Sequence, residues 1–197
     1  MNGTTTVSLV GVGGQGILLA AAVLANAALS QGLDVKASEV KGMAQRGGSV
    51  LSTVRFGADV ASPVAARADL VIATELLEGR RALRIVHPDG TLVCSEATIA
   101  PGSVLRREAE YPDDIVQAAA DRHVRLLMLD ADELARQAGS LRAANIVLLG
   151  AASASLPFSD AAWDQSLALT IPAKILELNQ RAFALGREAG LGREAGQ

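Results

Sequence analysis

Two glycine-rich stretches near the N-terminus hold the residues whose types and spacing could bind a ligand. The first is Gly11-Val12-Gly13-Gly14-Gln15-Gly16, which follows the apolar run Val7-Ser8-Leu9-Val10 and opens onto an alanine-rich run. A glycine loop between a strand and a helix lets backbone N–H groups approach a ligand, and the helix N-terminus adds a partial positive charge. A phosphate or a carboxylate is the expected guest. The binding residues expected in this loop are Gly13, Gly14, Gln15 and Gly16.

The second stretch follows another strand-like run, residues 35–40, and contains Gln45, Arg46, Gly47 and Gly48. A strand–helix–strand unit in one sheet makes a right-handed parallel crossover, so the first two strands should be neighbours. Their following loops then share the carboxyl edge of the sheet, where open α/β sheets bind ligands. We expect the two loops to face each other across one crevice, with Arg46 holding an anion. The alternative is a structural turn in which Arg46 pairs with Glu39 or another local acid.

Three interpretations of the first loop remain open from the residues alone. Glu39 lies about 20 residues past the glycines, where the ribose-binding acid of a dinucleotide site would stand, so NAD(P) or FAD is one candidate ligand. A different anion is the second interpretation, and a purely structural turn is the third. Glutamine and arginine are poor general bases at neutral pH, so we assign no catalytic residue to either loop.

The remaining pattern predicts the elements that would position these loops. Short apolar runs of the buried-strand type alternate with helical stretches, which is typical of an α/β fold. We predict one Rossmann-like domain, residues 1–184, with a doubly wound, mostly parallel sheet and a C-terminal helix. Residues 49–55 alternate in polarity and could form an antiparallel hairpin partner near the sheet edge, and residues 104–110 are expected to be extended. The glycine-rich repeat from Leu185 onward predicts a flexible tail, 185–197, because glycine weakens helices.

Composition excludes several classes of function. The 197 residues carry a net charge of −3, which gives no sign of nucleic-acid binding. The continuous apolar part of the first helix, residues 17–25, is shorter than the about 20 residues that cross a bilayer. One cysteine, Cys94, excludes an internal disulfide and an iron–sulfur cluster held by this chain alone. No histidine or cysteine set has metal-ligand spacing. With no signal peptide evident, we expect a cytoplasmic protein without a membrane partner.

The two loops also carry a family resemblance. Gly-x-Gly-Gly-Gln-Gly, followed by Glu39-Val40-Lys41-Gly42-Met43-Ala44-Gln45-Arg46-Gly47-Gly48-Ser49-Val50, resembles the gamma-type unit of 2-oxoacid:ferredoxin oxidoreductases. The similarity is greatest to the small (beta) subunits of the indolepyruvate enzymes. It is densest over residues 7–57, and weaker matches continue through Asn145, Leu149-Gly150, Pro172 and residues 179–186.

The resemblance implies a small, non-redox subunit that is inactive alone. Its partner would be a large (alpha) subunit carrying thiamine diphosphate and iron–sulfur clusters, with ferredoxin reached through the complex. Coenzyme A would be a co-substrate, and this chain would hold no tightly bound cofactor. The implied reaction converts a 2-oxoacid, coenzyme A and oxidised ferredoxin to acyl-CoA, carbon dioxide and reduced ferredoxin. Two alternatives remain: a free-standing NAD(P)-binding oxidoreductase, and an assembly module whose loops contact only protein.

Overall fold

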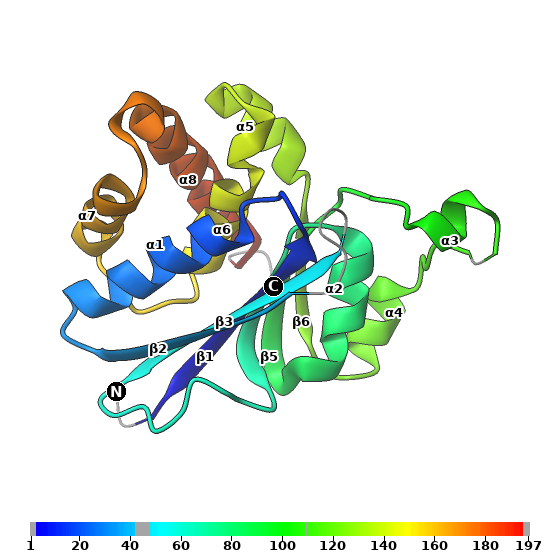
Figure 1. Cartoon of the computed structure of the whole chain (residues 1–197), viewed down its shortest axis with the longest axis horizontal. Helices are drawn as coiled ribbons and strands as arrows, with labels where there is room; N and C mark the ends of the chain where they lie inside the picture. Colours follow the sequence, from blue (N-terminus) through cyan, green and yellow to red (C-terminus); the bar gives the residue numbers. More distant parts are fainter. Residues whose placement is uncertain (1–2, 42–47, 109, 195–197) are drawn as a thin grey trace.

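A six-stranded mixed sheet in the order β2-β3-β1-β4-β5-β6 forms the centre of the molecule (Figure 1). The computed structural model describes residues 3–41, 48–108 and 110–194. β4, β5 and β6 continue parallel from β1, whereas β3 runs antiparallel to both of its neighbours. The strands are β1 (Thr5–Val12), β2 (Asp34–Lys41), β3 (Ser49–Gly57), β4 (Ala68–Ala73), β5 (Val86–Ser95) and β6 (Arg125–Leu129).

The prediction of a mostly parallel sheet with β1 and β2 as neighbours is wrong. β3 turns back from β2 as a hairpin and occupies the position next to β1, so β2 becomes the edge strand. Residues 49–57 therefore form the expected antiparallel hairpin partner, but this strand, β3, lies inside the sheet and not at its edge. Since β3 is antiparallel to both neighbours, β2 still points the same way as β1. The carboxyl ends of β1 and β2 consequently remain on the same edge.

Helices cover both faces of the sheet unequally (Figure 1). One face holds the larger apolar core, formed with the first helix and the C-terminal helices, and the opposite face holds a smaller core with α2 and α4. No helix in the described ranges is both long and apolar enough to cross a bilayer. The helices are α1 (Ile17–Ser30), α2 (Leu76–Ala82), η1 (Leu83–Ile85), α3 (Gly102–Leu105), α4 (Ile115–Ala120), α5 (Ala131–Ala138), η2 (Leu141–Ala143), α6 (Ala144–Ser153), α7 (Asp160–Thr170) and α8 (Ala173–Glu194).

Four of the five aromatic side chains meet in one row inside the larger core. Phe158 lies between Phe56 of β3 and Trp163 of α7, with ring centroids 4.9 and 5.4 Å apart. Trp163 in turn contacts Phe183 of α8 at 5.1 Å. Aromatic pairs at these spacings contribute beyond their buried area, each by about 1 kcal/mol. The row therefore fastens the C-terminal helices to the sheet.

The long helix α8 corrects the prediction of a flexible tail from residue 185, because helix continues through Glu194. Two of its glycines, Gly186 and Gly190, lie against the backbone of α6. A Cβ added to Gly186 would stand 1.9 Å from the Val147 carbonyl oxygen, and one added to Gly190 would stand 2.5 Å from that of Ala151. On α6, a Cβ on Gly150 would meet the Phe183 carbonyl oxygen at 2.1 Å. The glycines thus permit contact between helix backbones, which outweighs their low helix propensity. Residues 195–197 lie outside the described ranges.

The segment between β5 and α4 also differs from expectation. Residues 104–110 were predicted to be extended, but the chain forms the short helix α3 and then a turn at Arg107, whose φ is 59°. α3 projects away from the body of the molecule, beyond the edge of the sheet (Figure 1).

Candidate functional site

The two glycine stretches meet at the carboxyl edge of the sheet. The backbone N–H of Gly13 donates a 2.9 Å hydrogen bond to the carbonyl oxygen of Gly48, the residue just before β3. The expected proximity of the loops is therefore confirmed at this pair. Gln45, Arg46 and Gly47 lie outside the described residues, so the placement of Arg46 stays a prediction.

This edge is also where the direction of winding changes. The chain leaves β1 for α1 on one face of the sheet, and leaves β4 for α2 on the other, although β1 and β4 are hydrogen-bonded neighbours. Such a switch point opens a crevice beyond the carboxyl ends of the strands, and it is the usual ligand position in open α/β sheets. The loop of residues 13–16 stands at one side of the switch point, and Thr74 and Glu75 stand at the other.

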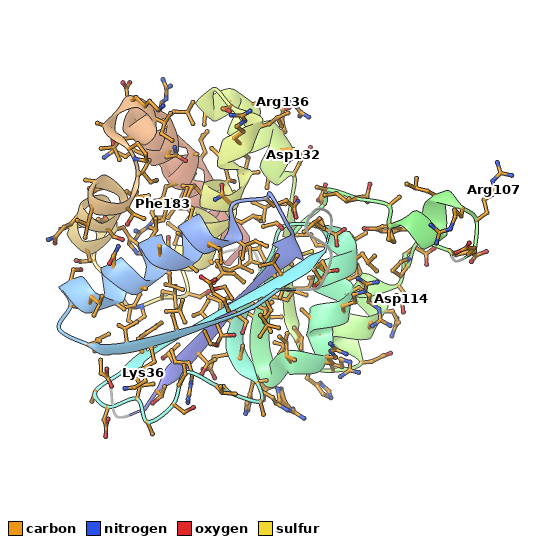
Figure 2. The ribbon with its side chains drawn as sticks, in the orientation of Figure 1. Lys36, Arg107, Asp114, Asp132, Arg136 and Phe183 are labelled. Carbon is orange, nitrogen blue, oxygen red and sulfur yellow. The ribbon has the colours of Figure 1, made fainter. Side chains whose placement is uncertain are left out.

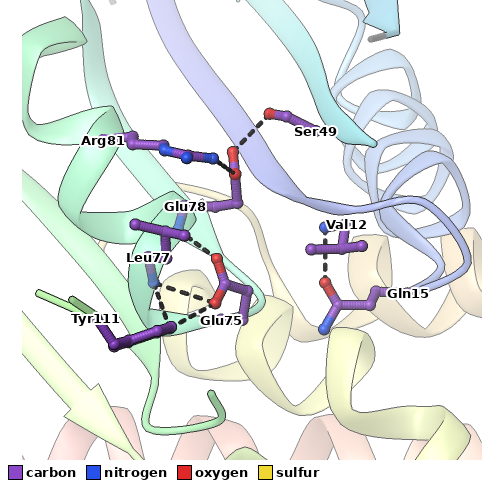
Figure 3. Close-up of polar contacts among 8 residues, drawn as sticks. All are labelled: Val12, Gln15, Ser49, Glu75, Leu77, Glu78, Arg81 and Tyr111. Carbon is purple, nitrogen blue, oxygen red and sulfur yellow. Dashed lines mark hydrogen bonds and ion pairs between the residues drawn. The ribbon is translucent and has the colours of Figure 1, made fainter. Parts of the chain in front are cut away.

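Gln15 does not extend into the crevice as a ligand donor but holds the loop closed. Its Oε1 accepts a hydrogen bond from the Val12 backbone N–H at 2.7 Å (Figure 3). The same oxygen accepts from the Thr74 hydroxyl at 2.6 Å, and Nε2 donates to the Thr74 carbonyl oxygen at 3.2 Å. Gly11 makes room for this arrangement, since a Cβ there would stand 1.8 Å from the Thr74 hydroxyl oxygen. The side-chain amide thus joins β1 to β4 across the switch point.

Gly16 ends the loop and begins α1. Its φ of 71° lies in the left-handed region, and within the described part of the chain no side-chain cap is found at the start of the helix. Asn145 of α6 donates from Nδ2 to the Gly16 carbonyl oxygen at 2.9 Å. The side chain is 3% exposed, and its Oδ1 has no hydrogen-bond partner among the described residues. The loop therefore presents uncapped N–H groups beside a buried amide oxygen, and Asn145, a weaker point of the family resemblance, fixes its position.

Glu75, which was not among the residues expected at the site, is the most buried carboxylate of this edge, at 1% exposure. It caps α2 by accepting hydrogen bonds from the backbone N–H groups of Leu77 and Glu78. The Tyr111 hydroxyl donates to its Oε2 at 2.8 Å (Figure 3). Burial, and then the bond to the Glu75 carboxylate, raises the pKa of Tyr111 above its usual range. Tyr111 is therefore a neutral donor that holds the segment before α4 against α2.

A second carboxylate, Glu78, ties α2 to the strand that follows the second loop. Glu78 is 6% exposed and accepts from the Ser49 hydroxyl at 2.5 Å and from Arg81 Nη1 at 2.6 Å (Figure 3). A hollow of about 120 Å³ adjoins this cluster, and it is lined by Val10, Ser49, Leu51, Glu78, Arg81, Ala82, Arg84 and Ile85. The bond from Ser49 fastens β3 to α2. Because the positive charge of Arg81 is paired with the Glu78 carboxylate, that arginine is not free to bind an anion.

The described residues offer binding groups at this edge and little that could make or break bonds. Burial, and then the nearby carboxylates of Glu75 and Glu96, raises the pKa of Cys94 to about 12, so the thiol is unreactive. Among the residues outside the gaps, no group of three His, Cys, Asp or Glu side chains could hold a metal ion. The described groups at this edge of the sheet are therefore suited to binding a ligand and not to catalysis.

The register disfavours a dinucleotide site of the Rossmann type. Glu39 of β2 lies opposite Ser52 of β3, and Ser52 lies opposite Leu9 of β1. Two strand spacings, about 10 Å, therefore separate Glu39 from β1, because β3 occupies the position that β2 takes in a dinucleotide unit. The acid that could have bound a ribose is displaced from the glycine loop.

Comparison with known proteins identifies the family. Residues 6–189 match the sequence family described as pyruvate ferredoxin/flavodoxin oxidoreductase. The chain is 36% identical over 188 residues to indolepyruvate oxidoreductase subunit IorB of Thermococcus kodakarensis, covering 92% of this chain and 93% of that subunit. The chain therefore belongs to the pyruvate ferredoxin/flavodoxin oxidoreductase family. Within the family its similarity to such IorB subunits extends over nearly the whole length of both chains.

Two solved structures share the fold. The gamma subunit of a keto/oxoacid ferredoxin oxidoreductase from Geobacter sulfurreducens gives a TM-score of 0.74 at 24% identity, covering 95% of this chain and 99% of that one. A 2-oxoglutarate:ferredoxin oxidoreductase from Magnetococcus marinus, solved with 2-oxoglutarate, coenzyme A and succinyl-CoA, gives 0.77 at 20% identity. The match covers 98% of this chain but 32% of that one. There, a domain of this fold is one part of a much longer polypeptide.

Proposed function

We propose that this chain is the small subunit of an indolepyruvate ferredoxin oxidoreductase, acting in the cytoplasm with a large catalytic subunit. The complex converts indolepyruvate, coenzyme A and two oxidised ferredoxins to the corresponding acyl-CoA, carbon dioxide, two reduced ferredoxins and a proton. The observation that carries the proposal is the 36% identity to an indolepyruvate oxidoreductase subunit over more than nine-tenths of both chains.

The composition of the chain supports a division of labour between the subunits. Thiamine diphosphate supplies the electron sink for decarboxylation, and iron–sulfur clusters carry the electrons to ferredoxin. A cluster requires about four thiolate ligands, and this chain has one cysteine, which is buried. The residues of this chain do not fit a cluster, so we assign these cofactors to the large subunit.

For this chain we propose a binding role, in which the two glycine loops complete the active site and seat the phosphates of coenzyme A. Three features support it. The N–H groups at the start of α1 lack a side-chain cap, Gly14 has open space around its α-carbon, and the loops are joined through Gly13 and Gly48. Backbone N–H groups at a helix N-terminus suit phosphate oxygens, and Arg46 would add a charge-assisted bond.

The first experiment co-expresses the tagged chain with the large subunit under anaerobic conditions. We expect a brown complex that reduces ferredoxin only when indolepyruvate and coenzyme A are both present, and a colourless, inactive chain when it is expressed alone. A chain that purifies alone beside an expressed large subunit would refute the subunit assignment. If that isolated chain also bound NADPH, the dinucleotide interpretation would replace it.

The role of the loops is tested by Arg46→Ala in the assembled enzyme. Loss of one charge-assisted bond to phosphate should raise the KM for coenzyme A about tenfold while leaving the KM for indolepyruvate unchanged. Arg67→Ala is the control, because Arg67 is exposed and directly precedes β4, at the edge of the sheet opposite the glycine loops. Equal KM values for coenzyme A in both variants would contradict the binding role and would favour loops that contact only protein.

A further inference from the structure

An arm formed by residues 98–108 leaves the same edge of the sheet and carries an exposed apolar residue near its end. Leu105, the last residue of α3, is 73% exposed, and Arg106 and Arg107 follow it in an exposed turn. Figures 1 and 2 show α3 standing clear of the body, with Arg107 at its outer end. The arm thus presents a leucine and two arginines that the fold of this chain does not use.

The base of the arm is fixed on both sides. On the incoming side, the Ala97 carbonyl oxygen accepts from the Leu76 backbone N–H at 2.9 Å, and the Glu96 backbone N–H donates to the Leu129 carbonyl oxygen at 3.0 Å. On the outgoing side, Tyr111 is held by Glu75, and Asp114 forms a bidentate ion pair with Arg80 at 2.7 and 2.8 Å. Because the base of the arm is already held in place, less conformational entropy is lost when the end of the arm binds a partner.

The same base is connected to the glycine loop through Thr74 and Glu75, the two residues that follow β4. Thr74 bonds Gln15 of the loop, and Glu75 bonds Tyr111 at the base of the arm. The arm and the loop are therefore positioned by one short stretch at the switch point. A partner that completed the site at the glycine loop would therefore lie at the same edge of the sheet as the arm.

The charges at the end of the arm define what it fits. Arg106 is paired with Glu108 at 2.7 Å, whereas Arg107 has no ion-pair or hydrogen-bond partner for its side chain among the described residues. An exposed leucine beside an uncompensated arginine suits an apolar pocket bordered by a carboxylate. Protein interfaces commonly have an apolar core and a polar rim, and opposite charges on the two partners attract each other.

We propose that the arm of residues 98–108 docks on the large subunit, with Leu105 in an apolar pocket and Arg107 facing a carboxylate at its border. The assignment of the occupant rests on the proposed function. It is supported by the Magnetococcus marinus structure, in which a domain of this fold occupies about a third of a longer chain. In this chain α3 stands clear of the other elements, so the end of the arm is accessible to such a neighbour (Figure 1).

The test compares two leucines of equal exposure. Leu105 and Leu169, in α7, are both 73% exposed, so Leu105→Glu and Leu169→Glu make the same chemical change on the arm and on the opposite helical layer. Binding of each folded variant to the purified large subunit is measured anaerobically. We expect Leu105→Glu to weaken binding at least tenfold and Leu169→Glu to leave it unchanged. Arg107→Glu should weaken binding a few-fold, with a loss that shrinks at high salt.

Each outcome decides the question. If the wild-type chain does not bind the large subunit, the proposed function fails. If the wild type binds and the two leucine variants bind equally, the arm is not the interface. Thermal unfolding of the isolated variants checks folding. Should Leu105→Glu not fold, hydrogen exchange on the wild type decides, because the Leu105 and Arg107 amides must gain protection in the complex, and unchanged exchange overturns the proposal.

Discussion

Glycine serves opposite purposes at the ligand edge of the sheet and in the contact between α6 and α8. At the edge, a Cβ on Gly14 would meet nothing within 4 Å, and one on Gly13 would lie 3.7 Å from its nearest neighbour. Between the helices, a Cβ on Gly186 or Gly150 would lie 1.9 or 2.1 Å from a carbonyl oxygen of the other helix. The loop glycines leave space open, whereas the helix glycines fill it with backbone.

This difference separates two kinds of constraint on one residue type. In the helix pair, folding itself forbids a side chain. At Gly13 the folded chain has room for one, so under the proposed function a side chain there would obstruct only what approaches the loop. Substitution by alanine at each position therefore distinguishes a fold requirement from a binding requirement.

The largest effect is expected in α8. Gly186→Ala should lower the free energy of unfolding by about 3 kcal/mol, because overpacking against the Val147 carbonyl outweighs the gain of about 1 kcal/mol in helix propensity. Gly192→Ala is the matched control in the same helix, since a Cβ there has open space, and it should raise the value by up to about 1 kcal/mol. Denaturant unfolding measures both. If both substitutions shifted the free energy of unfolding in the same direction, the distinction between open and filled glycines would fail.

An intermediate effect is expected where the loop enters α1. Gly16→Ala places an L-residue at a φ of 71° and brings its Cβ within 2.5 Å of Asn145 Nδ2. The left-handed conformation alone costs an L-residue about 1–2 kcal/mol, so we expect a loss of about 2 kcal/mol in unfolding free energy. The double variant with Asn145→Ala should lose less than the sum of the two single losses, because it removes the clash. Strict additivity in this cycle would contradict the observed contact.

The smallest effect on stability, but not on activity, is expected at Gly13. Gly13→Ala should change the free energy of unfolding by less than about 0.5 kcal/mol, as is usual for unstrained surface positions. In the assembled enzyme the same variant should raise the KM for coenzyme A several-fold, because the methyl group obstructs the approach of a phosphate to the backbone. Steady-state kinetics beside an unfolding curve test this pair of expectations. A stability loss comparable to that of Gly16→Ala would remove the distinction between open and filled glycines.

The sequence was sufficient to predict the features that depend on local pattern. It predicted the strand–loop–helix at residues 7–30 and the meeting of the two glycine stretches, because parallel strands end at the same edge. It could not predict that β3 separates β1 from β2. A hairpin strand has the same alternating pattern whether it lies at an edge or inside a sheet. Its position in the sheet is determined by pairing with strands far along the chain.

The missed parts of the site and of the tail have a similar physical origin. The bond between Gln15 and Thr74 joins residues 59 positions apart, and the bond between Tyr111 and Glu75 joins residues 36 positions apart, so neither leaves a signal in its own neighbourhood. For α8, local propensity predicted a broken helix, but the glycines are compensated by backbone packing against α6. Tertiary contacts decided in each case.

The burial of Cys94 makes this chain well suited to optical labelling. Thiol-specific dyes react with thiolates, and a sulfur whose pKa is about 12 presents almost none at neutral pH. Since the chain has no other cysteine, a thiol introduced on its surface would be the sole reactive one. Arg107→Cys and Leu169→Cys would thus each carry a single fluorophore, on the arm and on the opposite layer, without removal of the native residue. The change in emission on adding the large subunit would then report assembly in real time.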